Sequence, residues 1–149
     1  CGYLHLPYIL NPKVSYTNYV YETKVTVGLS KHYMDYAQEI IAYGGVKPSS
    51  FVVDLGSNDG TMLKHFANKA IRHLGIEPSA NVAKVAMEQG INTNVKFFDK
   101  SLAEKIVVEN GHADAFIATN VMCHIPDIVG VVKCILMLFR ETSHPACSN

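Results

Sequence analysis

The 149-residue sequence has no excess of charge and no long apolar segment. It contains 13 Lys and Arg residues against 13 Asp and Glu residues, whereas a protein that binds a nucleic-acid backbone needs clustered cationic side chains. Its longest apolar stretch, 128–139, has 12 residues and includes Lys133, and about 20 apolar residues are needed to cross a bilayer. The composition therefore argues against nucleic acids and membranes as partners.

Cysteine is also scarce, and its spacing lacks any paired pattern. The four cysteines are Cys1, Cys123, Cys134 and Cys147. A secreted disulfide scaffold would be denser in cysteine, so we expect reduced thiols and a cytoplasmic protein. The sequence begins at Cys1 with neither an initiator methionine nor a signal sequence. We interpret it as a piece of a longer protein.

Tyrosine is absent after residue 43, and this uneven distribution divides the chain. All eight tyrosines lie between Tyr3 and Tyr43. We expect an aromatic N-terminal segment and helix at 1–46, a ligand-binding domain at 47–140 and a tail at 141–149. Within the first segment, apolar residues recur at helical spacing over 30–43, and Gly44-Gly45 is expected to end that helix.

The remainder alternates between strand and helix patterns, and with 48% apolar residues it can build a core. Strands are expected at 51–55, 71–77, 95–98 and 113–119. Helices are expected at 61–69, 79–89 and 127–139, and a capping box at 101–104 is expected to open one more. This alternation predicts right-handed βαβ units, and so an α/β fold with a Rossmann-like, doubly wound, mostly parallel sheet.

The first expected strand ends in a glycine turn, and ligands bind outside the carboxyl ends of such strands. Gly56 and Gly60 flank Ser57, and they allow the backbone to approach a ligand closely. Asn58 stands where a dinucleotide fingerprint has its middle glycine, and Asp54 would repel a pyrophosphate. The turn therefore argues against a dinucleotide-dependent oxidoreductase and suits a ligand that carries an ammonium group.

Two further strand ends carry complementary groups. Glu77 closes the second expected strand and can accept hydrogen bonds from two ribose hydroxyls. Phe98 closes the third and offers an apolar face for a purine, while Asp99 offers a carboxylate to the exocyclic amine. S-adenosylmethionine (SAM) has the ammonium, the ribose and the adenine, and it has no phosphate. These three strand ends together predict a SAM site.

Four longer strings carry a specific resemblance. They are VDLGSNDG at 53–60, HLGIEPS at 73–79, FF at 97–98 and ATNVMCHIP at 118–126. On these strings the chain resembles the sugar C-methyltransferase branch of the class I SAM-dependent methyltransferases, which act on nucleotide-linked ketodeoxysugars. The resemblance implies the class I fold, SAM or S-adenosylhomocysteine as cofactor, and a small-molecule substrate that is a nucleotide sugar.

The resemblance also implies roles for further residues. Pro78, Asn120 and Val121 are expected to contact the cofactor, and Tyr21, in the string 19–21, belongs to an aromatic segment that covers it. The alternative for these tyrosines is packing against the sheet edge. Cys1 resembles the last remnant of a zinc knuckle, and one thiolate cannot build a four-ligand site. We therefore expect no metal.

Methylation of a carbon next to a ketone requires a base and stabilisation of an enolate. His124 follows the fourth expected strand, and the pKa range of histidine suits a base near neutral pH. We interpret His124 as the base, or as a hydrogen-bond donor to the sugar or enolate. The alternative is a histidine that caps the next helix.

Two alternatives to a sugar C-methyltransferase remain: a methyltransferase for another small molecule, and a non-catalytic SAM-binding module. The family's acceptor pocket is built largely from segments that follow the fourth helix. We therefore expect this chain by itself to bind cofactor weakly and not to turn over. A sheet that ends after four strands leaves one edge unpaired, which predicts a homodimer through that edge.

Overall fold

The computed structural model describes residues 11–16, 19 and 22–139. The N-terminal part contributes the short helix α1 (Pro12–Ser15), the 3-10 turn η1 (Thr23–Val25) and the long helix α2 (Leu29–Tyr43). The elements that follow are β1 (Phe51–Leu55), α3 (Lys64–Ala67), β2 (Arg72–Ile76), α4 (Ala80–Glu88), β3 (Thr93–Asn94), α5 (Lys100–Asn110), β4 (Ala115–Ile117), η2 (Met122–His124) and α6 (Ile128–Leu138).

The four strands form one sheet in the order β3-β2-β1-β4, and all three pairings are parallel. The chain extends the sheet from β1 through β2 to β3 and then crosses back to place β4 on the other side of β1. The strand order therefore reverses between β1 and β4, where doubly wound sheets bind ligands. The predicted α/β, Rossmann-like fold is confirmed.

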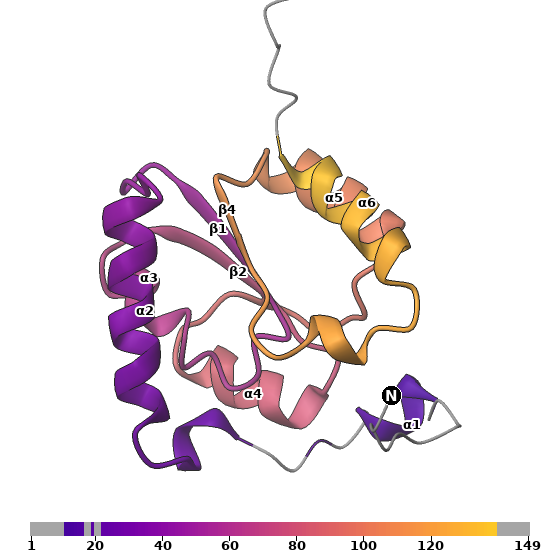
Figure 1. Ribbon diagram of the computed structural model, residues 1–149, viewed down its shortest axis with the longest axis horizontal. Coiled ribbons are helices and arrows are strands. Elements are labelled where there is room, and N and C mark those ends of the chain that lie inside the picture. The colour runs from indigo at the N-terminus through magenta and orange to yellow at the C-terminus, as the bar shows by residue number, and fades with distance from the viewer. Residues whose placement is uncertain (1–10, 17–18, 20–21, 140–149) are drawn as a thin grey trace, which may run out of the picture.

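Helices cover both faces of this sheet (Figure 1). Every residue of β1 is buried, as expected for a central parallel strand. Phe51, Val53 and Leu55 pack with α5 and α6, whereas Val52 belongs to a second cluster with α2 and α3. The predicted stripe on α2 is confirmed, since Tyr33 and Ala37 are buried against that second cluster.

The strand expected at 95–98 is wrong, because pairing ends at Asn94. The β2 side donates to β3 from alternate residues, Gly75 to Asn92 and Glu77 to Asn94, and the next donor in this register, the N–H of Ser79, is taken by Glu77 Oε1. Without a partner the chain turns away from the sheet. The phenylalanines of this stretch line the cavity described below, and Phe97 is 40% exposed at the cavity wall.

Two helix starts also differ from the expectation. The N-cap of α5 is Asp99 and not Ser101: its carboxylate accepts the N–H of Leu102 at 2.8 Å. Helix α3 occupies only 64–67 of the expected 61–69, because Asp59 Oδ1 accepts the N–H of Thr61 at 3.1 Å and holds this stretch as a turn. Within the described ranges, no helix combines the length and apolar character that a membrane span requires.

Candidate functional site

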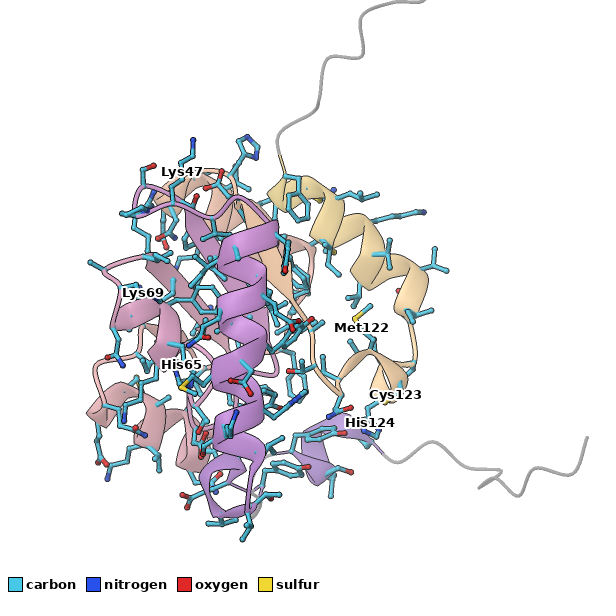
Figure 2. All side chains as sticks on the ribbon, turned by 60° about the vertical axis from the view of Figure 1, so that its left-hand side comes forward. Lys47, His65, Lys69, Met122, Cys123 and His124 are labelled. Carbon is cyan, nitrogen blue, oxygen red and sulfur yellow. The ribbon has the colours of Figure 1, made fainter. Side chains whose placement is uncertain are left out.

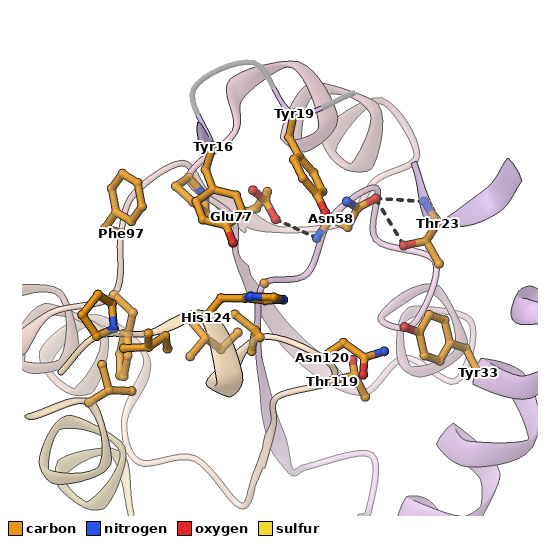
Figure 3. Close-up of a pocket in the computed structure, with 18 of the residues that line it drawn as sticks. Tyr16, Tyr19, Thr23, Tyr33, Asn58, Glu77, Phe97, Thr119, Asn120 and His124 are labelled. Carbon is orange, nitrogen blue, oxygen red and sulfur yellow. Dashed lines mark hydrogen bonds between the residues drawn. The ribbon is translucent and has the colours of Figure 1, made fainter. Parts of the chain in front are cut away.

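A cavity of about 260 Å³ lies at the carboxyl ends of the strands. Its walls come from the N-terminal segment, the glycine turn after β1, the end of β2 and the segments that follow β3 and β4 (Figure 3). Three tyrosines and two phenylalanines are among the lining residues. Among the described residues that line the cavity there is no lysine or arginine, and Glu77 is the carboxylate.

The glycine turn forms the floor of the cavity, and three of its residues have positive φ angles. The φ angles of Gly56, Asn58 and Gly60 are 70°, 50° and 76°, in the left-handed region, which glycine and asparagine tolerate best. Space is also limiting, because a Cβ added at Gly56 would lie 3.1 Å from the side chain of Val121. At Gly60 it would lie 2.9 Å from Ile91.

Glu77 is buried at the end of β2, with its carboxylate at the cavity wall. Its Oε2 accepts the N–H of Asn58 at 3.0 Å, and its Oε1 accepts the N–H of Ser79 at 2.8 Å. Burial raises the pKa of this carboxyl, and the two backbone donors together with the Ser79 side chain offset part of that rise. Each carboxylate oxygen has two lone pairs and can accept more than one hydrogen bond, which leaves acceptor capacity for a ligand in the cavity.

Asp54 is 1% exposed and lies beneath the turn, outside the cavity lining. Burial, together with the charge of Glu77, raises the pKa of Asp54 to about 8. Its Oδ1 has no hydrogen-bond partner among the described residues. The expected contact between Asp54 and a ligand's ammonium group stays a prediction. In the structure this carboxyl is buried and is not among the groups that line the cavity.

The segment after β3 brings two phenylalanines to the cavity. Phe97 and Phe98 both line it, and the Phe98 ring is tilted against the Phe116 ring with centroids 5.8 Å apart. Asp99 does not line the cavity, since its side chain caps α5. The expected contact of Asp99 with an adenine amine stays a prediction, and the structure assigns the residue a helix-capping role.

The segment after β4 forms the opposite wall. Asn120, Val121 and His124 all line the cavity, and Figure 2 shows Met122, Cys123 and His124 together on this segment. The alternative that His124 caps the next helix is wrong, because Asp127 accepts the N–H of Gly130 at 2.9 Å and caps α6. His124 is instead exposed at the cavity, across from Glu77 and Tyr16 (Figure 3).

The N-terminal segment contributes three tyrosines: Tyr19, in the string 19–21, was expected over the cofactor from the sequence, but Tyr16 and Tyr33 were not expected there. Tyr16 and Tyr19 line the cavity with ring centroids 5.5 Å apart, and Tyr33 reaches it from α2. The clustering of all tyrosines before residue 44 was the available signal. Tyr21 lies outside the described residues, as do Cys1 and Cys147.

The structure therefore brings most of the predicted site residues together. Those that line the cavity are Gly56, Asn58, Glu77, Pro78, Phe98, Asn120, Val121 and His124. Those that do not are Asp54, Ser57, Gly60 and Asp99. In the part of the chain that the structure describes, no group of three or more His, Cys, Asp or Glu side chains could hold a metal ion.

Comparison with known proteins bears on the same region. A family model described as a methyltransferase domain matches residues 30–147. C-methyltransferase NovU of Streptomyces niveus is 27% identical over 133 residues, which cover 89% of this chain and 32% of that protein. The chain thus spans about a third of the length of this curated relative.

Solved structures share the fold. The magnesium protoporphyrin IX methyltransferase ChlM of Synechocystis PCC 6803, solved with bound SAM, superposes with a TM-score of 0.59 at 18% identity, over 76% of this chain and 55% of that one. DesVI of Streptomyces venezuelae superposes with a TM-score of 0.56 at 16% identity, over 76% of this chain and 49% of that one.

Proposed function

We propose that this chain, which belongs to the methyltransferase-domain family, binds SAM in the cavity at the carboxyl ends of its strands and serves methyl transfer to a small molecule. The observation that carries the proposal is Glu77. Its buried carboxylate is held in place by two backbone donors and keeps acceptor capacity for a ligand in the cavity. That arrangement suits the two adjacent hydroxyls of a ribose.

The charge of the cavity favours SAM over a dinucleotide. A pyrophosphate needs backbone or cationic donors, whereas the described lining contains no lysine or arginine and presents Glu77. Aromatic faces attract cations, and SAM carries a sulfonium and an ammonium group. The rings of Phe97 and Phe98 offer an apolar surface for adenine. SAM bound in structural neighbours such as ChlM supports the same assignment.

We further propose that the acceptor is a nucleotide-linked ketodeoxysugar that is methylated on carbon. The 27% identity with C-methyltransferase NovU supports methylation on carbon, and the strings at 73–79 and 118–126, on which the chain resembles the sugar C-methyltransferases, support a sugar substrate. When bound, SAM supplies an electrophilic methyl group. His124 stands at the cavity wall opposite Glu77, where its imidazole can take the proton from the carbon next to the ketone.

The free thiols of Cys123 and Cys134 suit the cytoplasm that we propose as the location of this protein. Other small-molecule acceptors, and a module that binds SAM without catalysis, are alternatives that a transfer assay separates. In a longer protein that includes this chain, methyl-labelled SAM should transfer label to a ketodeoxysugar nucleotide, and His124→Ala should abolish that transfer while SAM still binds.

Calorimetry with SAM and with NAD tests the cofactor. We expect SAM to bind and NAD not to bind. Glu77→Ala should weaken SAM binding at least tenfold, because hydrogen bonds to a charged group contribute roughly 1.5–3 kcal/mol each. Glu77→Gln is the matched variant: it keeps the shape but loses the charge and one acceptor oxygen. An unchanged Kd in a folded Glu77→Ala protein would refute the ribose assignment.

A further inference from the structure

One atom, the side-chain Oδ1 of Asn58, joins the glycine turn to the N-terminal segment. It accepts the N–H of Thr23 at 3.0 Å, the hydroxyl of Thr23 at 3.2 Å and the N–H of Asp59 at 2.8 Å. Figure 3 shows the two contacts with Thr23 as dashed lines. Asn58 and Thr23 are both buried, so these hydrogen bonds form away from competing water.

The backbone of Asn58 performs a separate task. With φ at 50° it lies in the left-handed region, and its N–H donates to Glu77 Oε2 at 3.0 Å. Glycine would adopt this backbone at least as readily and would keep that N–H. The left-handed backbone alone therefore does not require asparagine. What a glycine would lack is the oxygen that binds Thr23 and that also accepts the N–H of Asp59.

The N-terminal segment carries the rings that cover the cavity. Tyr16 and Tyr19 line it, and their backbone carbonyls accept hydrogen bonds from the side chains of Ser79 and Asn81. Those two contacts hold the segment at the start of α4. Thr23 comes next along the chain, and its contact with Asn58 holds the segment at the glycine turn.

We propose that Asn58 is a positioning residue: through Thr23 it holds the tyrosine-bearing segment over the cavity and so strengthens cofactor binding. The consequence for SAM rests on the proposed function, whereas the attachment of the segment does not. This role explains why the middle position of the turn carries a side chain.

The test combines a ligand readout with a readout of the segment itself. The sequence has no tryptophan, and all eight tyrosines lie between Tyr3 and Tyr43. Tyrosine emission therefore reports on the N-terminal third alone. For Asn58→Gly we expect acrylamide to quench this emission more strongly than in the wild type without any ligand. We also expect the Kd for SAM to rise about tenfold, because both contacts with Thr23 are lost.

A double-mutant cycle separates positioning from direct contact. Thr23→Pro removes both Thr23 donors, and proline is tolerated at the first position of a helical turn. The preceding residue, Glu22, is already extended, as a residue before proline must be. We expect the double variant to bind SAM no more weakly than the single variant with the higher Kd, since both substitutions break the same contacts between Asn58 and Thr23. Additive losses would overturn the proposal.

Val25→Ala is the matched control, because Val25 belongs to the same 3-10 turn and is 65% exposed. It should change neither readout. If Asn58→Gly fails to fold, Thr23→Val removes one donor from the other end and should raise the Kd for SAM about threefold. If the wild-type protein does not bind SAM, the proposed function is refuted. If acrylamide quenches the tyrosine emission of both Asn58→Gly and Thr23→Pro only as strongly as that of the wild type, the attachment of the N-terminal segment through Asn58 is refuted.

Discussion

At the residue scale, Asp54 is an ionisable group placed where charge is costly. It is buried at the end of the central strand, and burial together with Glu77 raises its pKa from 3.8 to about 8. Between these two pH values the folded protein holds a proton on Asp54 that the unfolded chain has released. The stability that the protonated Asp54 contributes is therefore fully present below pH 3.8 and is lost as the pH rises to about 8.

We expect the free energy of unfolding to fall with pH between about 4 and 8, with Asp54 contributing at most about 1.4 kcal/mol per pH unit. Urea unfolding at several pH values measures this slope. Asp54→Asn should make this slope shallower. Part of the slope should remain, because the raised pKa of Glu77 acts in the same direction. Asp35→Asn, at an exposed position paired with Lys31, is the control and should leave the slope unchanged. Equal slopes in wild type and Asp54→Asn would contradict the prediction.

At the scale of the element, α5 shows how two candidate caps compete. Asp99 and Ser101 both precede the helix core, and Ser101 with Glu104 matches a capping box. The structure has Asp99 at the N-cap with extended backbone and a 2.8 Å bond to the N–H of Leu102, whereas Ser101 is exposed within the helix. The start of the helix two residues earlier buries Leu102 and Ala103 against the sheet.

Asp99→Ala should therefore lower the free energy of unfolding by roughly 1 kcal/mol, the usual cost of losing an N-cap. Ser101→Ala should change it little, and Asp99→Asn should retain most of the stability because asparagine also caps well. Chemical denaturation of the three variants measures these differences. A greater loss in Ser101→Ala than in Asp99→Ala would contradict the observed cap.

At the scale of the whole molecule, one side of the sheet is left open. Strand β4 pairs with β1, and no other described strand lies beyond it. Next to it, α6 exposes an apolar stripe of Val129, Val132 and Leu136, which are 63%, 42% and 65% exposed. A stripe of this kind beside an unpaired strand favours association, and the zero net charge of the chain offers no long-range repulsion.

We predict that this chain by itself forms a homodimer through the β4 edge and the α6 stripe. Sedimentation equilibrium measures the mass, and Val132→Lys combined with Leu136→Lys should shift the protein to monomer by placing two charges in the contact. Tyr43→Lys is the control: Tyr43 is 89% exposed at the end of α2 and lies away from this surface. A wild-type monomer, or a dimer that both lysines leave intact, would refute the prediction.

The sequence by itself determined the features that depend on neighbouring residues. The apolar run at 51–55 predicted a strand, and Gly56 and Gly60 predicted a turn directly after it, because steric limits on φ act within one residue. The alternation of patterns predicted the parallel α/β sheet, since strands joined by helices must run in the same direction. Glu77 was placed at the cavity because the carboxyl ends of parallel strands meet at one edge.

Tertiary structure decided the features that depend on distant partners. Residues 95–98 have a strand-like sequence, but the next N–H on the β2 side that could pair with them, that of Ser79, donates to the Glu77 carboxylate instead. Asp99 became the cap because its position lets α5 pack on the sheet. Tyr16 lies at the cavity where its carbonyl accepts the hydroxyl of Ser79. Farther along the same segment, Thr23 donates to Asn58. Such contacts join residues 35 or more positions apart in sequence, and local periodicity carries no information about them.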